Sequence, residues 1–468
     1  MILFHLDKHS TPADFLSEQL IRFVDYSTNT QLPQVFAVAF SHNARYLPEQ
    51  PQQELLAFVW LAVSYDNTSS PTLGASIFPA TSEHLSAIEQ LSAEPEAILA
   101  YCDAANLARV RLDLPLLLEP IYIPKPWGQE IWYTGIEARG QASVKGDKGS
   151  LPLPWVLEFL RPQLGLAATD NLILLKILDP LAEAPYGDLY FELHEQKQEV
   201  YVVTHVDAAA WPSGKGAIQL GFNPAARANY ATANDFKAGY LHAVREYEQT
   251  RRAIDSLLDR KKQELGISLN EPVAVKQLKL WLKELSQHPD NKALINRERE
   301  LKQSMDSFIA RHPLEVGDVV AVPRLVPHAL QHGVRVVEFQ TPVYERRILS
   351  FGQKVLTQNY WDTEVALQLV DMDAEPFIPP VQLAHTDKVQ IQRIVNFDDF
   401  EVQRIVLKGD CQLSVPFYGL LMVLEGSVCI NDNYMITSGN VALLAAQVAP
   451  QVLHSAAAVL LWAIPRFG

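Results

Sequence analysis

The spacing of hydrophobic residues changes twice along the middle of this chain. From about residue 116 to 210, short apolar runs are bounded by turn residues, as in LILLKILDP, GDLYFELHE and QEVYVVTHVD. Such runs, rich in Val, Ile, Leu and Tyr, predict β-strands. Residues 234–311 differ, because Val275, Leu278, Leu282 and Leu285 recur at helical spacing and form one apolar stripe. That stripe predicts an amphipathic helix packed on a core.

Three helices are expected in this middle segment. Asn234 and Asp235 can cap a helix that runs to Gly266, and Asn270, with Pro272 behind it, starts another. A third helix is expected over 290–311. The strand pattern returns at LEVGDVVAVPRLVPHAL and continues through RVVEFQTPVYERRILSF. Because the helices lie between two blocks of strands, we expect them to form an insertion within one barrel.

The two ends of the chain have patterns of their own. Near the N-terminus, a probable strand, ELLAFVWLAVSYD, precedes a helical region, SEHLSAIEQLSAEPEAILAYCDAANLARV, which predicts a mixed α/β segment. After the Pro-rich DAEPFIPPVQLAH, short alternating strands with Gly turns predict a second small barrel or sandwich. The fold expected is therefore mainly β with a helical insertion. The expected domains are an N-terminal α/β domain of unknown role (1–115), a barrel (116–212 and 313–372), an inserted helical domain (213–312) and a C-terminal barrel-like domain (373–468).

Composition and charge narrow the possible functions. A chain of 468 residues suggests roughly three domains. Its net charge of −15 disfavours nonspecific binding to nucleic acid or to anionic membranes, so an anionic ligand needs a local basic cluster. We expect no membrane span and no signal peptide, because apolar runs are short and the first residues lack a basic flank. Three scattered cysteines fit a reducing cytoplasm.

Two stretches carry candidate chemistry. In GDLYFELHEQKQE, Glu192 and His194 are two residues apart on a predicted strand and share one face, and a short turn returns Glu199 to that face. In GDVVAVPRLVPH, a buried strand runs into a Pro-restricted turn that delivers His328 inward. Two histidines and two carboxylates are a suitable ligand set for Zn²⁺, and equally for Mn²⁺ or Fe²⁺.

Together these stretches resemble the two sequence motifs of the cupins. Gly317, Pro323 and His328 fit the second motif closely, while Glu192 stands where the first motif usually has a His. The resemblance implies jelly-roll barrels and one divalent metal ion. The C-terminal region has no paired ligand segment, and His454 lies in no Gly-Pro-His frame. We therefore expect that region to be a metal-free cupin-like domain.

Within the cupins, the order of elements looks like that of the zinc-dependent mannose-6-phosphate isomerases. The resemblance covers roughly residues 116–468 and rests on KPWGQEIW, LLKILDP, the helical insertion and EFQTPVYERRILSFG. It implies metal ligands Glu192, His194, Glu199 and His328, active-site residues Lys197, Glu338 and Arg347, and substrate-binding residues Lys176 and Arg346, with Arg346 an alternative to Arg347.

The function implied is an aldose–ketose isomerase acting on a phosphorylated sugar. Two departures from the family pattern leave other functions open: Glu192 replaces a ligand Gln, and only four residues separate His194 from Glu199. The alternatives are a non-catalytic sugar-binding or regulatory cupin and another metal-dependent cupin enzyme, such as an oxygenase. The sequence does not reveal the sugar, the metal or the oligomeric state.

Overall fold

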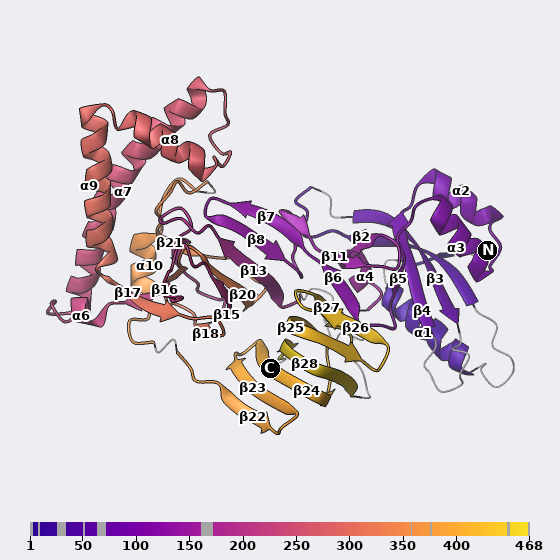
Figure 1. The fold of residues 1–468 in the computed structure, drawn as a ribbon. Helices are drawn as coiled ribbons and strands as arrows, with labels where there is room; N and C mark the ends of the chain where they lie inside the picture. The colour runs from indigo at the N-terminus through magenta and orange to yellow at the C-terminus, as the bar shows by residue number, and fades with distance from the viewer. Residues whose placement is uncertain are drawn as a thin grey trace. The chain divides into compact units, whose positions relative to one another are not determined.

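The structure is a computed structural model. It describes residues 3–7, 10–25, 34–49, 52–62, 72–160, 172–356, 358–374, 377–446 and 450–466. The chain forms two compact units (Figure 1). The first contains residues 1–121, 132–175 and 380–468, and the second contains residues 122–131 and 176–379. Strands predominate over helices, which confirms the expectation of a mainly β protein.

The first unit contains an N-terminal sheet of order β1-β2-β3-β4-β5. These strands are β1 (Leu3–His5), β2 (Gln34–Asn43), β3 (Gln52–Ala62), β4 (Thr72–Pro79) and β5 (Val110–Arg111). Three helices accompany them: α1 (Pro12–Asp25), α2 (Ser82–Gln90) and α3 (Pro95–Ala104). Thr81 caps α2 by accepting a hydrogen bond from the His84 amide. Residues of the sheet and of α2 and α3, including Phe58, Ile88 and Ile98, share one apolar cluster.

The first unit also contains a long, mostly antiparallel sheet of order β12-β11-β6-β27-β25-β28-β24-β23-β22, with β26 paired to β25. The strands from the end of the chain are β22 (Val381–His385), β23 (Val389–Asn396), β24 (Phe400–Leu413), β25 (Gly419–Ile430), β26 (Tyr434–Thr437), β27 (Val441–Leu444) and β28 (Gln451–Pro465). Their apolar residues form a cluster that includes Ile405, Val423, Leu460 and Trp462.

Three strands from residues 116–152 complete this sheet: β6 (Leu116–Glu119), β11 (Ser143–Lys145) and β12 (Ser150–Pro152). β6 pairs with β27, so that Leu118 lies opposite Val441. The sequence had assigned residues 116–212 to the other barrel, and β6, β11 and β12 depart from that assignment. An apolar run predicts a strand but not its partner, which explains the difference. The remaining short elements of this unit are β9 (Ile136–Glu137), β10 (Gly140–Gln141) and α4 (Leu153–Leu157).

The second unit is built around two sheets. One has the order β18-β15-β20-β13-β8-β7 and the other β17-β16-β19-β14-β21. Their strands are β7 (Ile121–Lys125), β8 (Gly128–Trp132), β13 (Leu174–Pro180), β14 (Phe191–Leu193), β15 (Glu199–Val206), β16 (Gly216–Phe222), β17 (Ile309–Leu314), β18 (Val319–Val322), β19 (His328–Leu330), β20 (Val334–Gln340) and β21 (Arg347–Ser350). Tyr201, Ile218, Leu330 and Val336, which come from both sheets, share one apolar cluster. This two-sheet region carries the candidate site.

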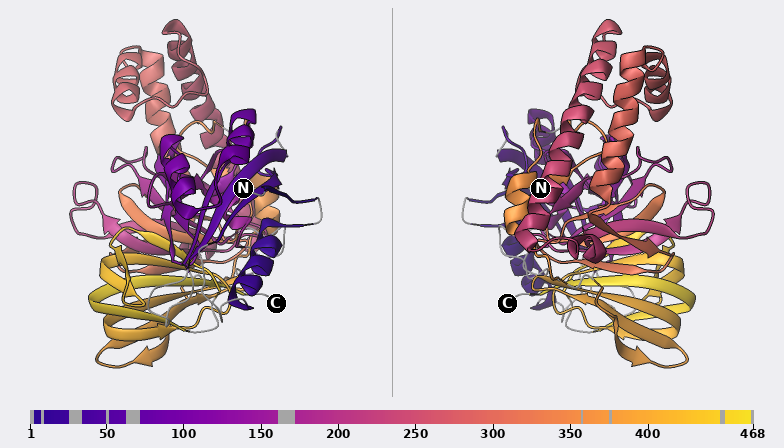
Figure 2. Two further views of the ribbon diagram at one scale, coloured as in Figure 1. Left: turned by 90° about the vertical axis from the view of Figure 1, so that its right-hand side faces the viewer. Right: turned by 90° about the vertical axis from the view of Figure 1, so that its left-hand side faces the viewer.

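Helices are inserted between β16 and β17. They are α6 (Pro224–Arg227), α7 (Ala233–Glu264), α8 (Val275–Leu285) and α9 (Pro289–Asp306), and α10 (Thr363–Leu369) follows later. Thr232 caps α7 by accepting a hydrogen bond from the Asp235 amide. The second helix begins later than expected, and the third ends earlier because Ile309 already belongs to β17, which pairs with β16. α7 and α9 run side by side and extend from the strands of their unit (Figure 2).

The inserted helices cover one face of the five-stranded sheet. Phe191 and Leu193 of β14 share an apolar cluster with Tyr240 and Val244 of α7 and Leu301 of α9. The alternate residue of the same strand, Glu192, therefore faces the other way. Among the described residues, no helix is both long and apolar enough to cross a lipid bilayer.

Candidate metal centre

Three side chains converge inside the two-sheet region. His194 directly follows β14, Glu199 opens β15 and His328 opens β19; all three are buried. Their potential ligand atoms lie within 4.8 Å of one another. His194 Nε2 is 3.4 Å from Glu199 Oε1, and His328 Nε2 is 3.2 Å from Glu199 Oε2. The pairing of β14 with β19, which sets Glu192 opposite His328, brings the two sequence stretches together.

The hydrogen bonds of both imidazoles suit metal binding. His194 Nδ1 lies 3.0 Å from the Glu345 carbonyl oxygen, and His328 Nδ1 lies 3.1 Å from the Val326 carbonyl oxygen. A carbonyl can only accept, so each Nδ1 donates a proton and each Nε2 presents a lone pair to the site. His194 Nε2 is buried and has no hydrogen-bond partner in the part of the chain that the structure describes. Two such nitrogens and a carboxylate fit a divalent ion.

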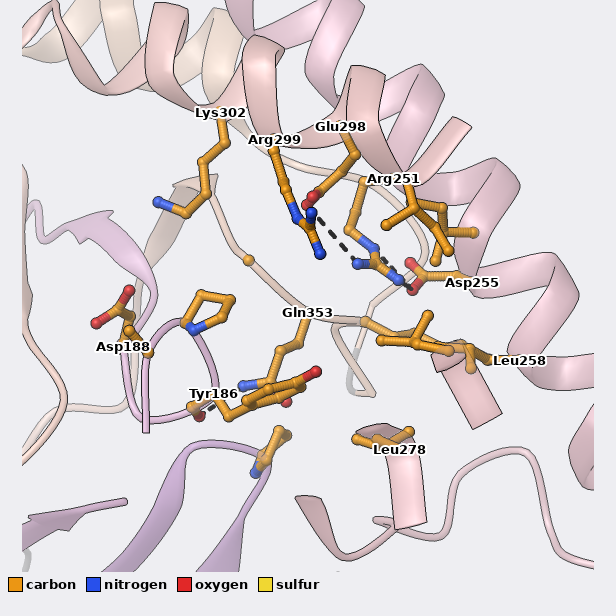
Figure 3. Close-up of a pocket in the computed structure, with 18 of the residues that line it drawn as sticks. Tyr186, Asp188, Arg251, Asp255, Leu258, Leu278, Glu298, Arg299, Lys302 and Gln353 are labelled. Carbon is orange, nitrogen blue, oxygen red and sulfur yellow. Dashed lines mark hydrogen bonds and ion pairs between the residues drawn. The ribbon is translucent and has the colours of Figure 1, made fainter. Parts of the chain in front are cut away.

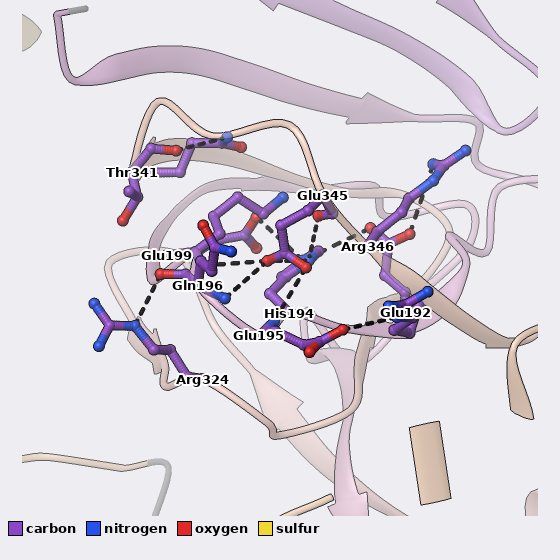
Figure 4. A network of polar contacts seen from close by, with 12 residues as sticks. Glu192, His194, Glu195, Gln196, Glu199, Arg324, Thr341, Glu345 and Arg346 are labelled. Carbon is purple, nitrogen blue, oxygen red and sulfur yellow. Dashed lines mark hydrogen bonds and ion pairs between the residues drawn. The ribbon is translucent and has the colours of Figure 1, made fainter. Parts of the chain in front are cut away.

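Glu345 fixes the turn that carries the ligands. Its carboxylate accepts hydrogen bonds from the backbone N–H groups of Glu195, Gln196 and Lys197, at 3.1–3.2 Å. Its carbonyl oxygen also holds His194 Nδ1. Figure 4 shows the Glu345 side chain lying against this turn. One residue therefore sets both the path of the chain between His194 and Glu199 and the orientation of the first imidazole.

Four ion pairs surround the three potential ligands. They are Lys125–Glu130 at 3.2 Å, Lys176–Glu338 at 3.2 Å, Lys197–Glu199 at 2.6 Å and Arg346–Glu192 at 3.6 Å. Each of the four carboxylates in this cluster therefore has a cation within 4.0 Å.

The pKa shifts follow from burial and from these pairs. Burial lowers the pKa of His194 well below its usual value, so the imidazole is neutral. Burial alone would raise the pKa of Glu199, but Lys197 and the neighbouring histidines lower it well below its usual value. Burial and the Glu199 carboxylate raise the pKa of Glu338 well above its usual range. The pKa values of Glu199 and Glu338 are thus shifted in opposite directions, which is a pattern typical of functional sites.

The fourth expected ligand, Glu192, lies farther out. Its Oε1 is 3.9 Å from His194 Nε2, and its side chain is 18% exposed. Its other oxygen faces Arg346, whose guanidinium lies 4.6 Å from the centre of the Tyr190 ring. Glu192 therefore connects the three potential ligands to Arg346.

The two adjacent arginines have different surroundings. Arg347 lies opposite Leu193, which faces the inserted helices, and its Nε is 2.8 Å from Glu195 Oε1. The Arg347 side chain is 40% exposed, whereas that of Arg346 is 17% exposed. Figure 4 shows Arg346 pointing toward Glu192. The sequence favoured Arg347 as the active-site arginine, but in the structure Arg346 lies beside the cluster.

The structure brings Lys176, Lys197 and Glu338 to the same interior. Glu338 lies opposite Tyr201 in the β15–β20 ladder, and Lys176 shares a strand face with the core residue Leu178. Burial alone would lower the pKa of Lys176, but Glu130, Glu338 and Glu199 raise it above its ordinary value. Lys176 therefore stays charged although it is buried.

Sequence reasoning missed two residues that contact the site. Tyr201 donates a hydrogen bond from its hydroxyl to Glu199 Oε2 at 2.7 Å. The signal for Tyr201 was available, because it stands two residues after Glu199 on a predicted strand and so shares its face. Glu345 gave no such signal, since its role depends on a turn 150 residues away.

Comparison with solved structures shows that the fold is similar to that of mannose 6-phosphate isomerases. The mannose 6-phosphate isomerase from Bacillus subtilis matches 75% of this chain and 99% of its own, with 14% identity and a TM-score of 0.51. The R274A mutant of phosphomannose isomerase from Salmonella typhimurium matches 75% of this chain and 100% of its own, with the same identity and TM-score. At this identity the likeness concerns the fold alone. No family model and no curated protein sequence matches the chain.

Proposed function

We propose that this protein is a metal-dependent aldose–ketose isomerase that acts on a phosphorylated sugar, as its structural neighbours named above do. The observation that carries the proposal is the buried convergence of His194, Glu199 and His328 in an interior that also holds the cations Lys176, Lys197 and Arg346. Such a site is suited to one divalent ion and one phosphate dianion. Within the cupin-like barrel that we propose for the two-sheet region, Glu192 is a fourth potential ligand.

Aldose–ketose isomerisation moves a proton between C1 and C2 of the sugar through an enediol. A bound Zn²⁺, Mn²⁺ or Fe²⁺ would stabilise the negative charge that develops on the sugar oxygens. A donor set of two imidazoles and one carboxylate suits each of these ions.

The residues of the chain would bind the sugar and move the proton. Glu338 and Lys197 are the two groups that can carry it: Glu338 is buried with a raised pKa, and Lys197 Nζ is 2.6 Å from Glu199 Oε1. Lys176 neutralises Glu338 from 3.2 Å. We assign phosphate binding to Arg346 instead of Arg347, because Arg346 lies beside the cluster while Arg347 pairs with Glu195.

The test is a coupled isomerase assay on protein reconstituted with each of the three metals. Mannose 6-phosphate is supplied and fructose 6-phosphate is detected. We expect turnover by the native protein and none above background by His328→Ala. In contrast, sugar binding without turnover with any metal would identify a non-catalytic sugar-binding protein, and oxygen consumption by the iron form would identify an oxygenase.

The two arginines provide a matched pair for the same assay. We expect Arg346→Ala to raise KM by about tenfold or more, because a charge-assisted hydrogen bond contributes about 1.5–3 kcal/mol. Arg347→Ala removes the same charge from the neighbouring position and should leave KM nearly unchanged. The reverse result would assign phosphate binding to Arg347.

Metal content tests the ligands separately from activity. We expect one tightly bound divalent ion per native chain and none in the His194→Ala, His328→Ala double variant. Unchanged metal stoichiometry in the double variant would show that these histidines are not ligands.

A further inference from the structure

A cavity of about 1100 Å³ opens in the second unit beneath the inserted helices (Figure 3). Its walls come from α7, α8 and α9, from the loop around Tyr186 and from the segment around Gln353. This volume is slightly above the ~300–1000 Å³ that small-molecule sites usually have. None of the three potential metal ligands lines it.

The five-stranded sheet separates this cavity from the candidate metal centre. Gln219 of β16 lines the cavity, while its neighbours Ile218 and Leu220 point into the core between the two sheets. His328, which lies opposite Leu220 in the β16–β19 ladder, points to that inner side as well. Because successive residues of a strand face opposite sides, the two sites occupy opposite faces of one sheet.

Most charges on the cavity wall are already paired. Arg251 is 9% exposed and hydrogen bonds Asp255 through Nε and Nη2 at 3.0 and 2.8 Å. Lys302 Nζ is 2.5 Å from Asp306 Oδ2, and Lys354 binds both carboxylate oxygens of Asp259. In each of these three pairs the positive and negative charges cancel, so the pairs add no net charge to the cavity wall.

Four of the cations that line the cavity have no acidic partner among the residues that the structure describes: Lys262, Lys283, Arg299 and Arg311. Lys262 donates to the backbone carbonyls of Leu269 and Glu271, and the Arg311 guanidinium lies 5.2 Å from the centre of the Trp211 ring. For Arg299 no ion pair within 4.0 Å is found among the residues that the structure describes, and Figure 3 shows its guanidinium pointing into the cavity. The side chain comes from α9, one residue beyond Glu298, which faces Arg251 at 3.7 Å. Arg299 is an exposed side chain, so an anion that enters the cavity can reach its guanidinium and pair with it, in a chain whose net charge is −15.

Apolar side chains also line the cavity, beside the charged residues of α7 and α8. Leu258 of α7 and Leu278 and Leu282 of α8 line it, together with Pro185 and the ring of Tyr186. Both leucines of α8 are only half-buried, although the helix carries them on the side that faces the cavity. Filling the cavity with an apolar group would remove their remaining surface from water, which is favourable at about 25 cal/mol per Å².

We propose that this cavity is a second ligand site, for an organic anion with an aromatic or aliphatic body. The carboxylate or phosphate group would bind Arg299, and the body would lie against Leu258, Leu278 and Tyr186. An inorganic ion would leave the apolar side chains exposed, and a neutral apolar molecule would leave the guanidinium unpaired. The site takes a ligand of its own, independent of the proposed isomerase chemistry.

The experiment uses 1-anilinonaphthalene-8-sulfonate, a fluorescent aromatic anion, as the probe on the full-length protein. We expect saturable binding that Arg299→Glu weakens by about tenfold or more, since the attraction of one charge is replaced by repulsion. Arg297→Glu is the matched control: it makes the same charge change on the same helix, but Arg297 pairs with Glu300 and does not line the cavity. Its affinity should equal that of the native protein.

Competition then identifies the anionic group. Benzoate and phenyl phosphate should both displace the probe. Tighter binding of benzoate would indicate a carboxylate site, and tighter binding of phenyl phosphate would indicate a phosphate site. Phenol, with the same ring and no charge, should not. His328→Ala should bind the probe normally, which separates this site from the metal centre whatever the fate of the isomerase proposal. Equal weakening by Arg299→Glu and Arg297→Glu, or displacement by phenol as effective as by benzoate, would overturn the proposal.

Discussion

The two-sheet region and the long sheet of the first unit, here called the C-terminal sheet, are both built largely from antiparallel strands, yet they bury different side chains. In the C-terminal sheet the buried positions of β24, β25 and β28 are apolar apart from Ser455, as Ile405, Val423 and Leu460 show. The two-sheet region has a comparable apolar cluster, but it also buries charged and polar groups. They include Lys176, His194, Lys197, Glu199, His328 and Glu338.

This difference is informative because buried charge seldom adds net stability. Replacing a buried ion pair with apolar residues of similar volume is often neutral or stabilising, whereas removing one partner is strongly destabilising. The C-terminal sheet shows that strands of this chain can form a core without such groups. The polar interior of the two-sheet region therefore needs another explanation, and ligand binding supplies it.

Converting the polar interior to an apolar one is the strongest way to test this comparison. Lys176→Met alone leaves Glu338 buried without its partner; because its pKa is raised, Glu338 can take up a proton, and the free energy of unfolding should fall by about 1–3 kcal/mol, the cost of an unsatisfied buried polar group. The Lys176→Met, Glu338→Met double variant should recover most of that loss and should have no isomerase activity. Denaturant titration and the coupled assay measure the two quantities. If the double variant is as unstable as the single one, the Lys176–Glu338 pair stabilises the fold. The buried charges of the two-sheet region would then need no ligand to explain them.

A more moderate effect is expected from a substitution of Glu345, which holds the turn between two potential metal ligands. Glu345→Ala removes three hydrogen bonds to the turn between His194 and Glu199 but no potential ligand. Residues that orient metal ligands typically contribute 10–100-fold to affinity, so metal affinity should fall by about that factor. Isothermal titration with Zn²⁺ measures it.

Glu195→Ala is the control for the same turn. It removes a carboxylate that pairs with Arg347 and leaves the hydrogen bonds of Glu345 in place. Metal affinity should stay near that of the native protein. If both variants bind metal normally, the turn is rigid without Glu345 and its role is not positional.

The positions of the three potential ligands could be anticipated because their geometry is local. The two-residue alternation of strands relates Glu192 to His194, and the proline turn before His328 is visible in the sequence. The long helix α7 was predictable from its local pattern, but its cap was not: Asn234 and Asp235 were expected to cap it, whereas Thr232 does and both predicted residues lie within the helix. The apolar pattern also separated strands from helices over most of the chain.

Other features depend on contacts between distant residues and could not be anticipated. The hydrogen bond from His194 to the Glu345 carbonyl spans 151 residues. Which of two adjacent arginines faces the site depends on the pairing of β21 with β14, where the register shifts between Phe191 and Glu192. Likewise, no local pattern indicates that β6 pairs with β27 rather than with its neighbours in sequence.

The smallest effect should come from a histidine of the C-terminal sheet. His454 Nδ1 is 2.6 Å from Asp410 Oδ1, as close as many functional pairs, but the two side chains are 58% and 67% exposed. Water screens such a pair, so His454→Ala should change the free energy of unfolding by less than about 1 kcal/mol. Metal content should not change, in contrast to the loss expected for His194 and His328. Denaturant titration and metal analysis of His454→Ala therefore measure what burial contributes. If this variant lost its metal, an exposed histidine–carboxylate contact would be sufficient to bind a metal ion without a buried interior.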